Sequence, residues 1–588
     1  MDENPLVYNG FGLREKIGNY MAKSIIICSK NEIKRDLSKY TSYVRNSIEP
    51  ENINCLKPYV YEEKKLYTCV VNPTSTVKTN MAGCCLGVVD DDREQLWEPN
   101  SNIPDGTFTL FRHDNNYVEV VSDYTATRTI WYVFSDEYFV ASTSQRMIIS
   151  FLGYFQLNNK AVRWMLSAGI LGPENSWDVR INSLPGNSSI VLDRSTWTIE
   201  KNIYTGHQIK PINKSREWHK SNYENALNES LTLPGIDYSK WTLALSGGLD
   251  SRSIIYKLKD NDDKHSITWG VDGAQKEKNT DAYIANMIAK KCSYNHEYMS
   301  TNTESSDFVT TLNRFLIAGE GRVDHLSAYM DGLNLWSILH KSGRGIIRGY
   351  DAQGASTRVV TNERQARIAS TMILSSDYKG MFIPENLRVT EKDIPESLKK
   401  GSQETLEEWR DRLWLSFRTP VVTAALDEIK VAYVEIFNPL LFRKIVKAIK
   451  LLPDSYRNNK NLFRDMVKKM FPEIPYAKRD SIEELESILN NDQIKAVLRS
   501  ELLTRLDSNI LPDEFVKAVA DGIEKSSQRR SVLRILKKYY RSYVPMPVRN
   551  VIHKSVSYIP LDNRRIALRV LIVLRMHELL SNDAELEN

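Results

Sequence analysis

Up to about residue 205, short runs of apolar and β-branched residues alternate with turn-forming residues. Runs of this kind predict β-strands, and one helical stretch, residues 160–171, interrupts them. Many short strands with few long helical patterns predict a layered, largely antiparallel β-rich domain. The predicted strands cover residues 23–29, 65–71, 84–89, 106–112, 117–123, 129–134, 138–143 and 188–194.

From about residue 218, amphipathic helical stretches alternate with strand-like runs, a pattern that predicts a parallel sheet covered on both faces. After residue 400 the pattern is almost entirely helical. The expected fold class is thus a mixed α/β and α+β multidomain chain, with parts at 1–205, 218–480 and a helical, basic extension at 481–588. The strand-like runs are 241–246, 265–271 and 345–350, and the later helices are expected at 403–417, 439–451, 460–470, 482–505 and 526–578.

Composition narrows the class of protein only a little. The 588 residues are 41% hydrophobic and 26% charged, with a net charge of +5, which gives no overall case for nucleic-acid binding. The six cysteines show no CxxC spacing, so free thiols in a reducing cytoplasm are expected. The N-terminus shows no secretory signal. The apolar run at 566–574 is too short to span a bilayer, so we expect a cytoplasmic protein without a transmembrane segment.

The stretch WTLALSGGLDSR, residues 241–252, carries the clearest chemical signal. A strand that ends in small residues and opens a helix presents backbone N–H groups that bind anions. Gly247 and Gly248 let the backbone approach a phosphate closely, while Ser246 and Ser251 add hydroxyl donors. A carboxylate suits bare phosphate poorly, so Asp250 predicts a magnesium ion between it and the anion.

The stretch SGGLDS also resembles the pyrophosphate-loop motif SGGxDS of enzymes that cleave ATP between its α and β phosphates. The resemblance implies ATP and Mg²⁺ as ligands, with Asp250 and Asp351 as metal ligands. A tight turn with no ligand is the alternative. The residues expected to bind the nucleotide are Leu245, Ser246, Gly247, Gly248, Leu249, Asp250, Ser251, Gly270, Arg348 and Gly349.

Further ordered landmarks make the chain resemble the asparagine synthetase superfamily, which includes β-lactam synthetases and lasso-peptide cyclases. This resemblance implies an N-terminal nucleophile-type β-sandwich, like that of class II glutamine amidotransferases, over residues 1–205. It also implies an adenine-nucleotide α-hydrolase-like synthetase domain over 218–480. The landmarks are PDGTFTLFR (104–112), residues 122–143 with Arg128, INSLPGNSSIVLD (181–193), IIRGYDAQG (346–354) and PYAKR (475–479).

Three departures from the family pattern change the expected chemistry. Position 2 is Asp2, where glutamine-using members carry a cysteine, and the first cysteine, Cys28, lies in mid-strand. A nucleophile activated by its own α-amine cannot come from mid-chain, so we expect a platform or binding module without glutaminase activity. The acidic SGEGADE loop of the family is replaced here by RGYDAQG. Asp351 in this loop would bind magnesium or the substrate, or would only stabilise a turn. The stretch 434–442 lacks the family's arginine and aspartate.

Two further residues receive a role from the resemblance alone. Lys478 stands where the family places a lysine that stabilises charge on the phosphates, although a lysine is ordinarily a solvated surface charge. Tyr329 lies near the region where some relatives deprotonate an amine with a tyrosine. The basic stretch 529–575 could bind an acidic partner such as a precursor peptide or maturation protein, a phospholipid surface or nucleic acid. A solvated helical face is the alternative.

The expected function is an ATP-dependent amide-bond synthetase that forms AMP and pyrophosphate. It would adenylate the carboxylate of a small molecule or peptide for attack by an amine, as in peptide cyclisation. Amidation of aspartate, a sugar acid or a peptide with free ammonia is the alternative reaction. An inactive scaffold that keeps the fold is the alternative from another class.

Overall fold

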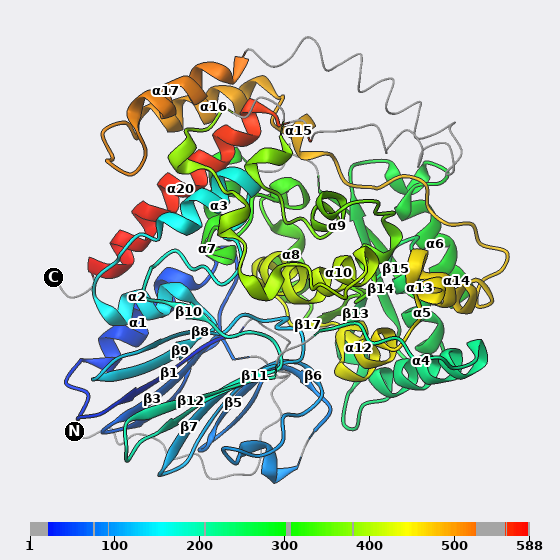
Figure 1. Ribbon diagram of the computed structural model, residues 1–588, viewed down its shortest axis with the longest axis horizontal. Coiled ribbons are helices and arrows are strands. Elements are labelled where there is room, and N and C mark those ends of the chain that lie inside the picture. The colour runs from blue at the N-terminus through cyan, green and yellow to red at the C-terminus, as the bar shows by residue number, and fades with distance from the viewer. Residues whose placement is uncertain are drawn as a thin grey trace.

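An antiparallel two-sheet sandwich and a parallel sheet wrapped by helices make up the protein (Figure 1). The computed structural model describes residues 22–73, 77–91, 93–204, 207–301, 307–378, 382–524, 559 and 561–585. The fold is therefore mixed α/β, as the hydrophobic pattern predicts. Asp2 and most of the basic stretch lie outside the described residues.

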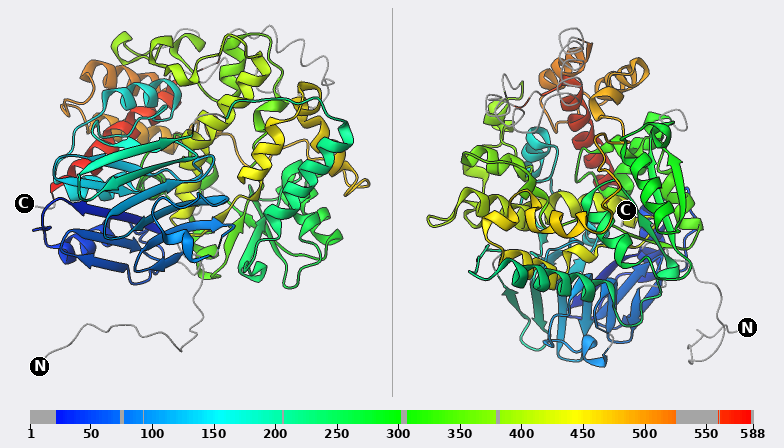
Figure 2. Two further views of the ribbon diagram at one scale, coloured as in Figure 1. Left: turned by 60° about the horizontal axis from the view of Figure 1, so that its bottom comes forward. Right: turned by 90° about the vertical axis from the view of Figure 1, so that its right-hand side faces the viewer.

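The sandwich consists of two six-stranded antiparallel sheets, in the orders β10-β8-β9-β1-β3-β2 and β12-β11-β7-β6-β5-β4. The two sheets lie face to face (Figure 2). Their facing sides share one core, in which Ile26 and Phe111 are fully buried. Along β1 the intervening residues Ile25 and Ile27 pack on the opposite side, in the cluster that also contains residues of α1 and α2. The strands are β1 (Lys23–Ser29), β2 (Tyr59–Glu63), β3 (Leu66–Val71), β4 (Lys78–Asn80), β5 (Gly83–Val89), β6 (Gly106–His113), β7 (Tyr117–Ser122), β8 (Trp131–Phe134), β9 (Tyr138–Ser142), β10 (Asn182–Ser183), β11 (Ser188–Asp193) and β12 (Thr198–Ile203).

All eight strands predicted in this part are present, but four others are not predicted by the sequence. β2, β4, β10 and β12 lie at the sheet edges, and their side chains are largely exposed. An edge strand with exposed side chains needs no apolar alternation, so the pattern that reveals buried strands is missing there.

The parallel sheet has five strands in the order β15-β14-β13-β16-β17. Helices cover both of its faces, since Leu243 packs in one buried cluster with α5, α6 and α12, whereas Ile346 packs in another with Trp336 of α8. Coverage of both faces confirms the interpretation of the alternating pattern after residue 218. The strands are β13 (Trp241–Ala244), β14 (His265–Gly270), β15 (Asn295–Ser300), β16 (Gly345–Ile347) and β17 (Ile436–Phe437).

The helices after residue 400 are more broken than expected. The predicted helix 403–417 is α10 followed by a π-helix, η11 (Trp414–Thr423), which contains Pro420. Proline lacks the N–H for a regular helical bond, which favours such a local distortion. The predicted helix 482–505 is two helices, α15 and α16. The helices are α1 (Leu37–Ile48), α2 (Gln145–Leu152), α3 (Asn159–Ala168), α4 (Arg216–Leu231), α5 (Leu249–Lys257), α6 (Asp281–Lys291), α7 (Phe308–Gly319), α8 (Asn334–Lys341), α9 (Glu363–Ala369), α10 (Leu406–Leu413), α11 (Ala424–Val431), α12 (Arg443–Lys450), α13 (Asp454–Arg457), α14 (Asn461–Lys468), α15 (Leu485–Ile488), α16 (Asp492–Leu503), α17 (Asp513–Gly522) and α20 (Asn563–Ala584).

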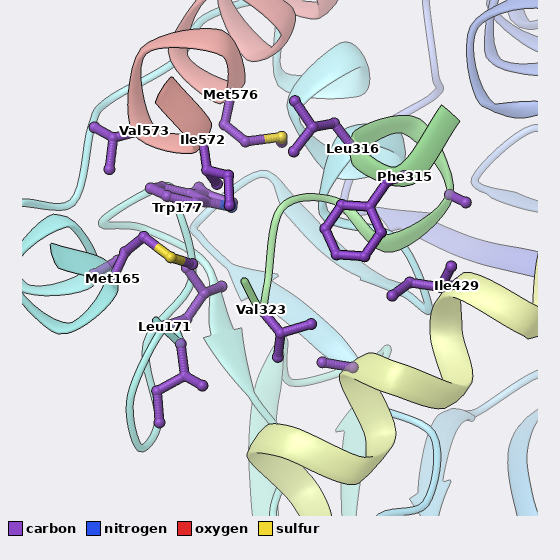
Figure 3. Packing of buried hydrophobic residues seen from close by; sticks show 14 of the residues in the cluster. Met165, Leu171, Trp177, Phe315, Leu316, Val323, Ile429, Ile572, Val573 and Met576 are labelled. Carbon is purple, nitrogen blue, oxygen red and sulfur yellow. The ribbon is translucent and has the colours of Figure 1, made fainter. Parts of the chain in front are cut away.

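The last helix, α20, is integrated into the core rather than appended as an extension. It lies beside α3, α16 and α17 (Figure 1), and Ile572 and Met576 project toward Trp177 and Leu316 (Figure 3). Among the described residues, no helix combines the length and the apolar character needed to cross a membrane.

Four arginines of the predicted basic surface belong to α20 and bind groups of the protein itself. Arg564 pairs with Asp562, Arg565 and Arg569 pair with Asp324, and Arg575 pairs with Glu501. These four side chains are thus committed to internal contacts and do not form the expected docking surface. The other basic residues of the stretch, from Arg529 to Lys554, lie outside the described residues.

Buried ion pairs connect the sandwich to the rest of the chain. Lys23, the first residue of β1, places its Nζ atom 3.0 Å from Glu320 and 2.9 Å from Glu428. Arg128 pairs with Glu435, the residue that precedes β17. An unpaired buried charge is costly, so these ion pairs favour one placement of the sandwich against the rest of the chain.

Candidate functional site

The strand order of the parallel sheet reverses between β13 and β16. β14 and β15 follow on one side of β13, and β17 lies on the other side of β16. In sheets of this order, a crevice forms at the carboxyl ends of the two strands where the order reverses, and ligands bind there. The glycine loop follows β13, and the RGYDAQG loop follows β16, so both predicted loops lie at this position.

Hydroxyl groups within the glycine loop hold it in shape. The backbone N–H of Ser246 donates to Ser251 Oγ at 3.1 Å, and that of Gly248 donates to Ser246 Oγ at 3.2 Å. The two serine hydroxyls are 2.9 Å apart. The serines therefore build the turn that opens α5, in addition to any contact with a ligand.

The three glycines of the two loops differ in what surrounds them. A Cβ on Gly349 would lie 2.8 Å from the backbone nitrogen of Ser251, so the two loops touch through this glycine. A Cβ on Gly247 would lie 2.7 Å from the Cβ of Ala477. Gly248 is open, because the only atom within 4 Å of such a Cβ is Ser246 Oγ at 3.2 Å. The open side of the loop is thus at Gly248.

A carboxylate from the neighbouring helix already interacts with the loop. The N–H of Gly247 donates to Asp281 Oδ1, in the first turn of α6, at 2.8 Å. Burial raises the pKa of Asp281 to about 6, although the Gly247 hydrogen bond opposes that shift. The loop thus binds an anionic group of its own chain, and a phosphate would compete with Asp281 for this N–H.

Lys460 connects the two aspartates of the predicted metal site. Its Nζ atom lies 2.8 and 3.1 Å from the two carboxylate oxygens of Asp250, and it also pairs with Asp351. Burial raises the pKa of Asp250 to about 6, against the effect of Lys460. The pKa of Lys460 is raised, because the two carboxylates outweigh its burial. Sequence reasoning missed Lys460, since its stretch NNKNLFR carries no signal that separates it from other lysines.

The predicted magnesium ligands converge, but around an ammonium group. Two carboxylates directed at one position suit a hard cation that is completed by phosphate oxygens. Within the described ranges, no cluster of three or more His, Cys, Asp or Glu side chains could hold a metal ion. Asp250 and Asp351 would therefore hold magnesium only together with a phosphate-bearing ligand and with Lys460 displaced.

Residues 474–481 form a segment that lies against the glycine loop. The N–H of Ala477 donates to the Gly247 carbonyl at 3.4 Å, and Arg252 donates to the Ile474 carbonyl at 2.9 Å. Lys478 follows directly with an exposed side chain, while its backbone N–H donates to Asn279. The backbone at Lys478 thus lies beside the loop through the contact of Ala477 with Gly247, while the lysine side chain is exposed.

Gly270 lies at the correct edge of the sheet but is covered. A Cβ there would lie 2.2 Å from the carbonyl oxygen of Ser481, and the N–H of Val271 donates to that oxygen at 2.8 Å. Its lack of a side chain lets segment 474–481 approach β14. We therefore assign Gly270 to this packing, in place of the expected nucleotide contact.

Tyr329 is not suited to the catalytic role predicted for it. The residue is 1% exposed, and its hydroxyl donates to the Leu426 carbonyl at 3.3 Å. Burial raises the pKa of its phenol further above the usual value. Arg348, in the loop after β16, pairs with Asp427 of α11. Both side chains thus bind groups of α11.

The fold and the site together define a two-sheet sandwich joined to a five-stranded parallel sheet, with a glycine loop where the strand order reverses. No protein-family model matches the chain, and no curated protein is similar to it in sequence. Its function therefore has to be argued from the site itself.

Proposed function

We propose that this protein is an ATP-dependent amide-bond synthetase that forms AMP and pyrophosphate, related to the asparagine synthetase superfamily. The observation that carries the proposal is the position of SGGLDS, which opens α5 at the carboxyl end of β13, where the strand order reverses. In this proposal the sandwich is a degenerate glutamine-amidotransferase-like domain, and the parallel sheet is an adenine-nucleotide α-hydrolase-like domain.

The residues of the site divide the work of binding ATP and its products. The open side of the loop at Gly248 and the first turn of α5 would receive the phosphates released as pyrophosphate. Asp250 and Asp351 would hold magnesium, which supplies charge neutralisation when bound. The exposed Lys478 would stabilise negative charge that develops on the phosphates.

The reaction proceeds in two steps, in which pyrophosphate and then AMP are the leaving groups. An oxygen of the substrate carboxylate attacks the α-phosphorus of ATP, and the bond to the β-phosphate breaks to release pyrophosphate. The nitrogen of an amine then attacks the activated acyl carbon, AMP departs with the bonding electron pair, and the amine loses a proton. Activation is required because a carboxylate is a poor electrophile.

A glutamine-derived ammonia supply receives no support from Cys28. Its thiol is buried in β1, and burial raises its pKa to about 11, so the thiolate is scarce at neutral pH. An amine other than glutamine-derived ammonia is therefore the favoured nucleophile, in an intramolecular or peptide substrate. Free ammonia remains the alternative nucleophile, and an inactive scaffold the alternative from another class.

Substitution Gly248→Ala tests the proposal with little disturbance of the fold. The added methyl group meets only Ser246 Oγ at 3.2 Å, but it occupies the open side of the loop. We expect the affinity for the magnesium complex of α,β-methylene-ATP, measured by calorimetry, to fall about tenfold or more while the melting temperature stays near that of the wild type.

Gly401→Ala is the matched control, because its nearest neighbour to the added atom is Glu404 Cβ at 3.6 Å. This variant should bind the analogue as the wild type does. If the wild-type protein binds no analogue, or if both variants bind it equally well, the loop is a structural turn and the scaffold alternative stands.

Lys478→Ala should separate binding from chemistry. We expect the affinity for the nucleotide to change less than about threefold, whereas formation of AMP falls by about 100-fold or more, because the lysine acts on charge that develops during the reaction. Arg479→Ala, at the adjacent exposed position, is the control. Normal AMP formation in Lys478→Ala would remove this residue from the site.

A further inference from the structure

A cavity of about 910 Å³ lies between the sandwich and residues 397–421 of the helical region. β8 and the loops 171–175 and 183–186 line one side of it, and the π-helix η11 lines the other. Cavities of roughly 300–1,000 Å³ are the size that encloses a drug-sized organic ligand. The volume is therefore sufficient for a molecule considerably larger than water or ammonia.

Apolar surface makes up the larger part of the cavity wall, although Glu174, Glu404 and Glu408 also line it. Leu171, Leu184, Leu398, Leu415 and Val421 contribute side chains to it. Arg412, another lining residue, is neutralised by Glu404, with hydrogen bonds of 2.6 and 2.8 Å. An apolar body would thus find complementary surface here.

Two buried donors in the cavity lining have no partner. Arg322 is 4% exposed and Trp131 is 2% exposed. Nη2 of Arg322 donates to Thr129 Oγ1 at 2.6 Å, but its Nη1 and the indole Nε1 of Trp131 lack hydrogen-bond partners among the described residues. The guanidinium carbon lies 5.1 Å from the centre of the Trp131 ring.

The charge of Arg322 is also uncompensated by direct contact. No carboxylate of the described residues forms an ion pair with it, and the nearby Glu320 and Glu428 are both engaged by Lys23. Burial lowers the pKa of Arg322, although the charges of Glu428 and Glu320 oppose that shift. A buried cation without an ion-pair partner is costly, so an anion in the cavity would relieve this cost.

We infer that the cavity binds an organic monocarboxylate with an apolar body, whose carboxylate accepts hydrogen bonds from Arg322 and Trp131. Arginine binds carboxylates through charge-assisted hydrogen bonds that are stronger than neutral ones. The apolar walls select the body of the ligand, and the two unpartnered donors select its charged end. This inference stands independently of the proposed ATP chemistry.

The π-helix η11 connects this cavity to the candidate functional site. Leu415 and Val421 line the cavity, whereas Trp414 stacks on Tyr350 and donates its indole N–H to the Asp351 carbonyl at 3.0 Å. π-helical segments are common at functional sites. A ligand in the cavity therefore contacts the same helix that supports the aspartate loop.

N-dansyl-phenylalanine and its carboxamide provide a matched pair of fluorescent probes for the full-length chain without nucleotide. We expect saturable binding of the acid, with the amide binding at least about tenfold more weakly, since it lacks the negative charge. Arg322→Gln should lower the affinity for the acid by about tenfold or more and leave the affinity for the amide unchanged. Ser416→Trp, which fills the cavity from η11, should abolish binding of both probes.

Three results would overturn the inference: no saturable binding of the acid, equal affinity for acid and amide, or intact binding in Ser416→Trp. If Arg322→Gln does not fold, Trp131→Phe replaces it, because this change removes the unpartnered N–H and keeps an aromatic ring. Since no nucleotide is present, failure here leaves the nucleotide test at Gly248 unaffected, and failure at Gly248 leaves this test unaffected.

Discussion

Replacement of Lys460 by methionine should lower the free energy of unfolding by about 3 kcal/mol or more. The change leaves Asp250 and the buried Asp351 without the ammonium group that both contact. Removing one member of a buried ion pair exposes the remaining charge to its full desolvation cost. Urea unfolding at pH 7 measures the loss of stability.

The matched double variant Lys460→Met/Asp351→Asn should recover more than half of that loss, because it removes one of the two facing charges. A stability loss below about 1 kcal/mol, or no recovery in the double variant, would contradict the role assigned to Lys460.

The loss should also shrink as the pH falls from 7 to 5. Burial already raises the pKa of Asp250 to about 6 with Lys460 present, and removal of the ammonium raises it further. The folded variant therefore binds protons that the unfolded chain does not bind in this range, and its stability rises as the pH falls. A pH-independent difference between variant and wild type would contradict the proposed cause.

Asp324→Asn should have the largest effect on stability away from the site, about 3–5 kcal/mol. Its carboxylate is fully buried and accepts hydrogen bonds from Arg565 at 2.9 Å and from Arg569 at 2.7 Å. The asparagine leaves Arg569 without an anionic partner among the described residues and leaves Arg565 with Glu486 alone, at 3.3 Å. The expected result is loss of docking of α20, measured by urea unfolding and by protease sensitivity of the C-terminal region.

The same carboxylate should give the wild type a distinct response to acid. Burial alone would raise the pKa of Asp324, but Arg565 and Arg569 hold it well below 3.8. The corresponding stability is complete above the unfolded pKa of about 4 and is lost as the pH falls below it. In Asp324→Asn, the free energy of unfolding should therefore change less with pH below pH 4 than it does in the wild type. Asp521→Asn, at an exposed ion pair between α17 and α16, should leave the profile unchanged.

Much of the fold follows from local pattern. The buried strands of the sandwich and β13, β14 and β16 were predictable because alternating or continuous apolar runs are the direct consequence of burial on one or both faces. The exposed edge strands were not, since edge pairing depends on neighbours that the local sequence does not identify.

The candidate site was predictable only in part. The glycine loop is recognisable because its backbone geometry restricts the residue types at consecutive positions. Asp281 and Lys460 were not predicted, because a single aspartate or lysine acquires a role only when the fold brings it to the loop. Tyr329 shows the converse, since a residue with suitable chemistry is buried in the core.

The sequence by itself determined the two kinds of sheet and the loop between β13 and α5, because these depend on periodicity and on residue size at adjacent positions. Only the tertiary structure decided that Lys460 pairs with Asp250 and Asp351 and that α20 belongs to the core. It also decided that Arg322 lies beside a cavity with no ion-pair partner in the described part of the chain. Such pairings join residues 100 or more positions apart, and charge and burial become defined only once the chain has brought them together.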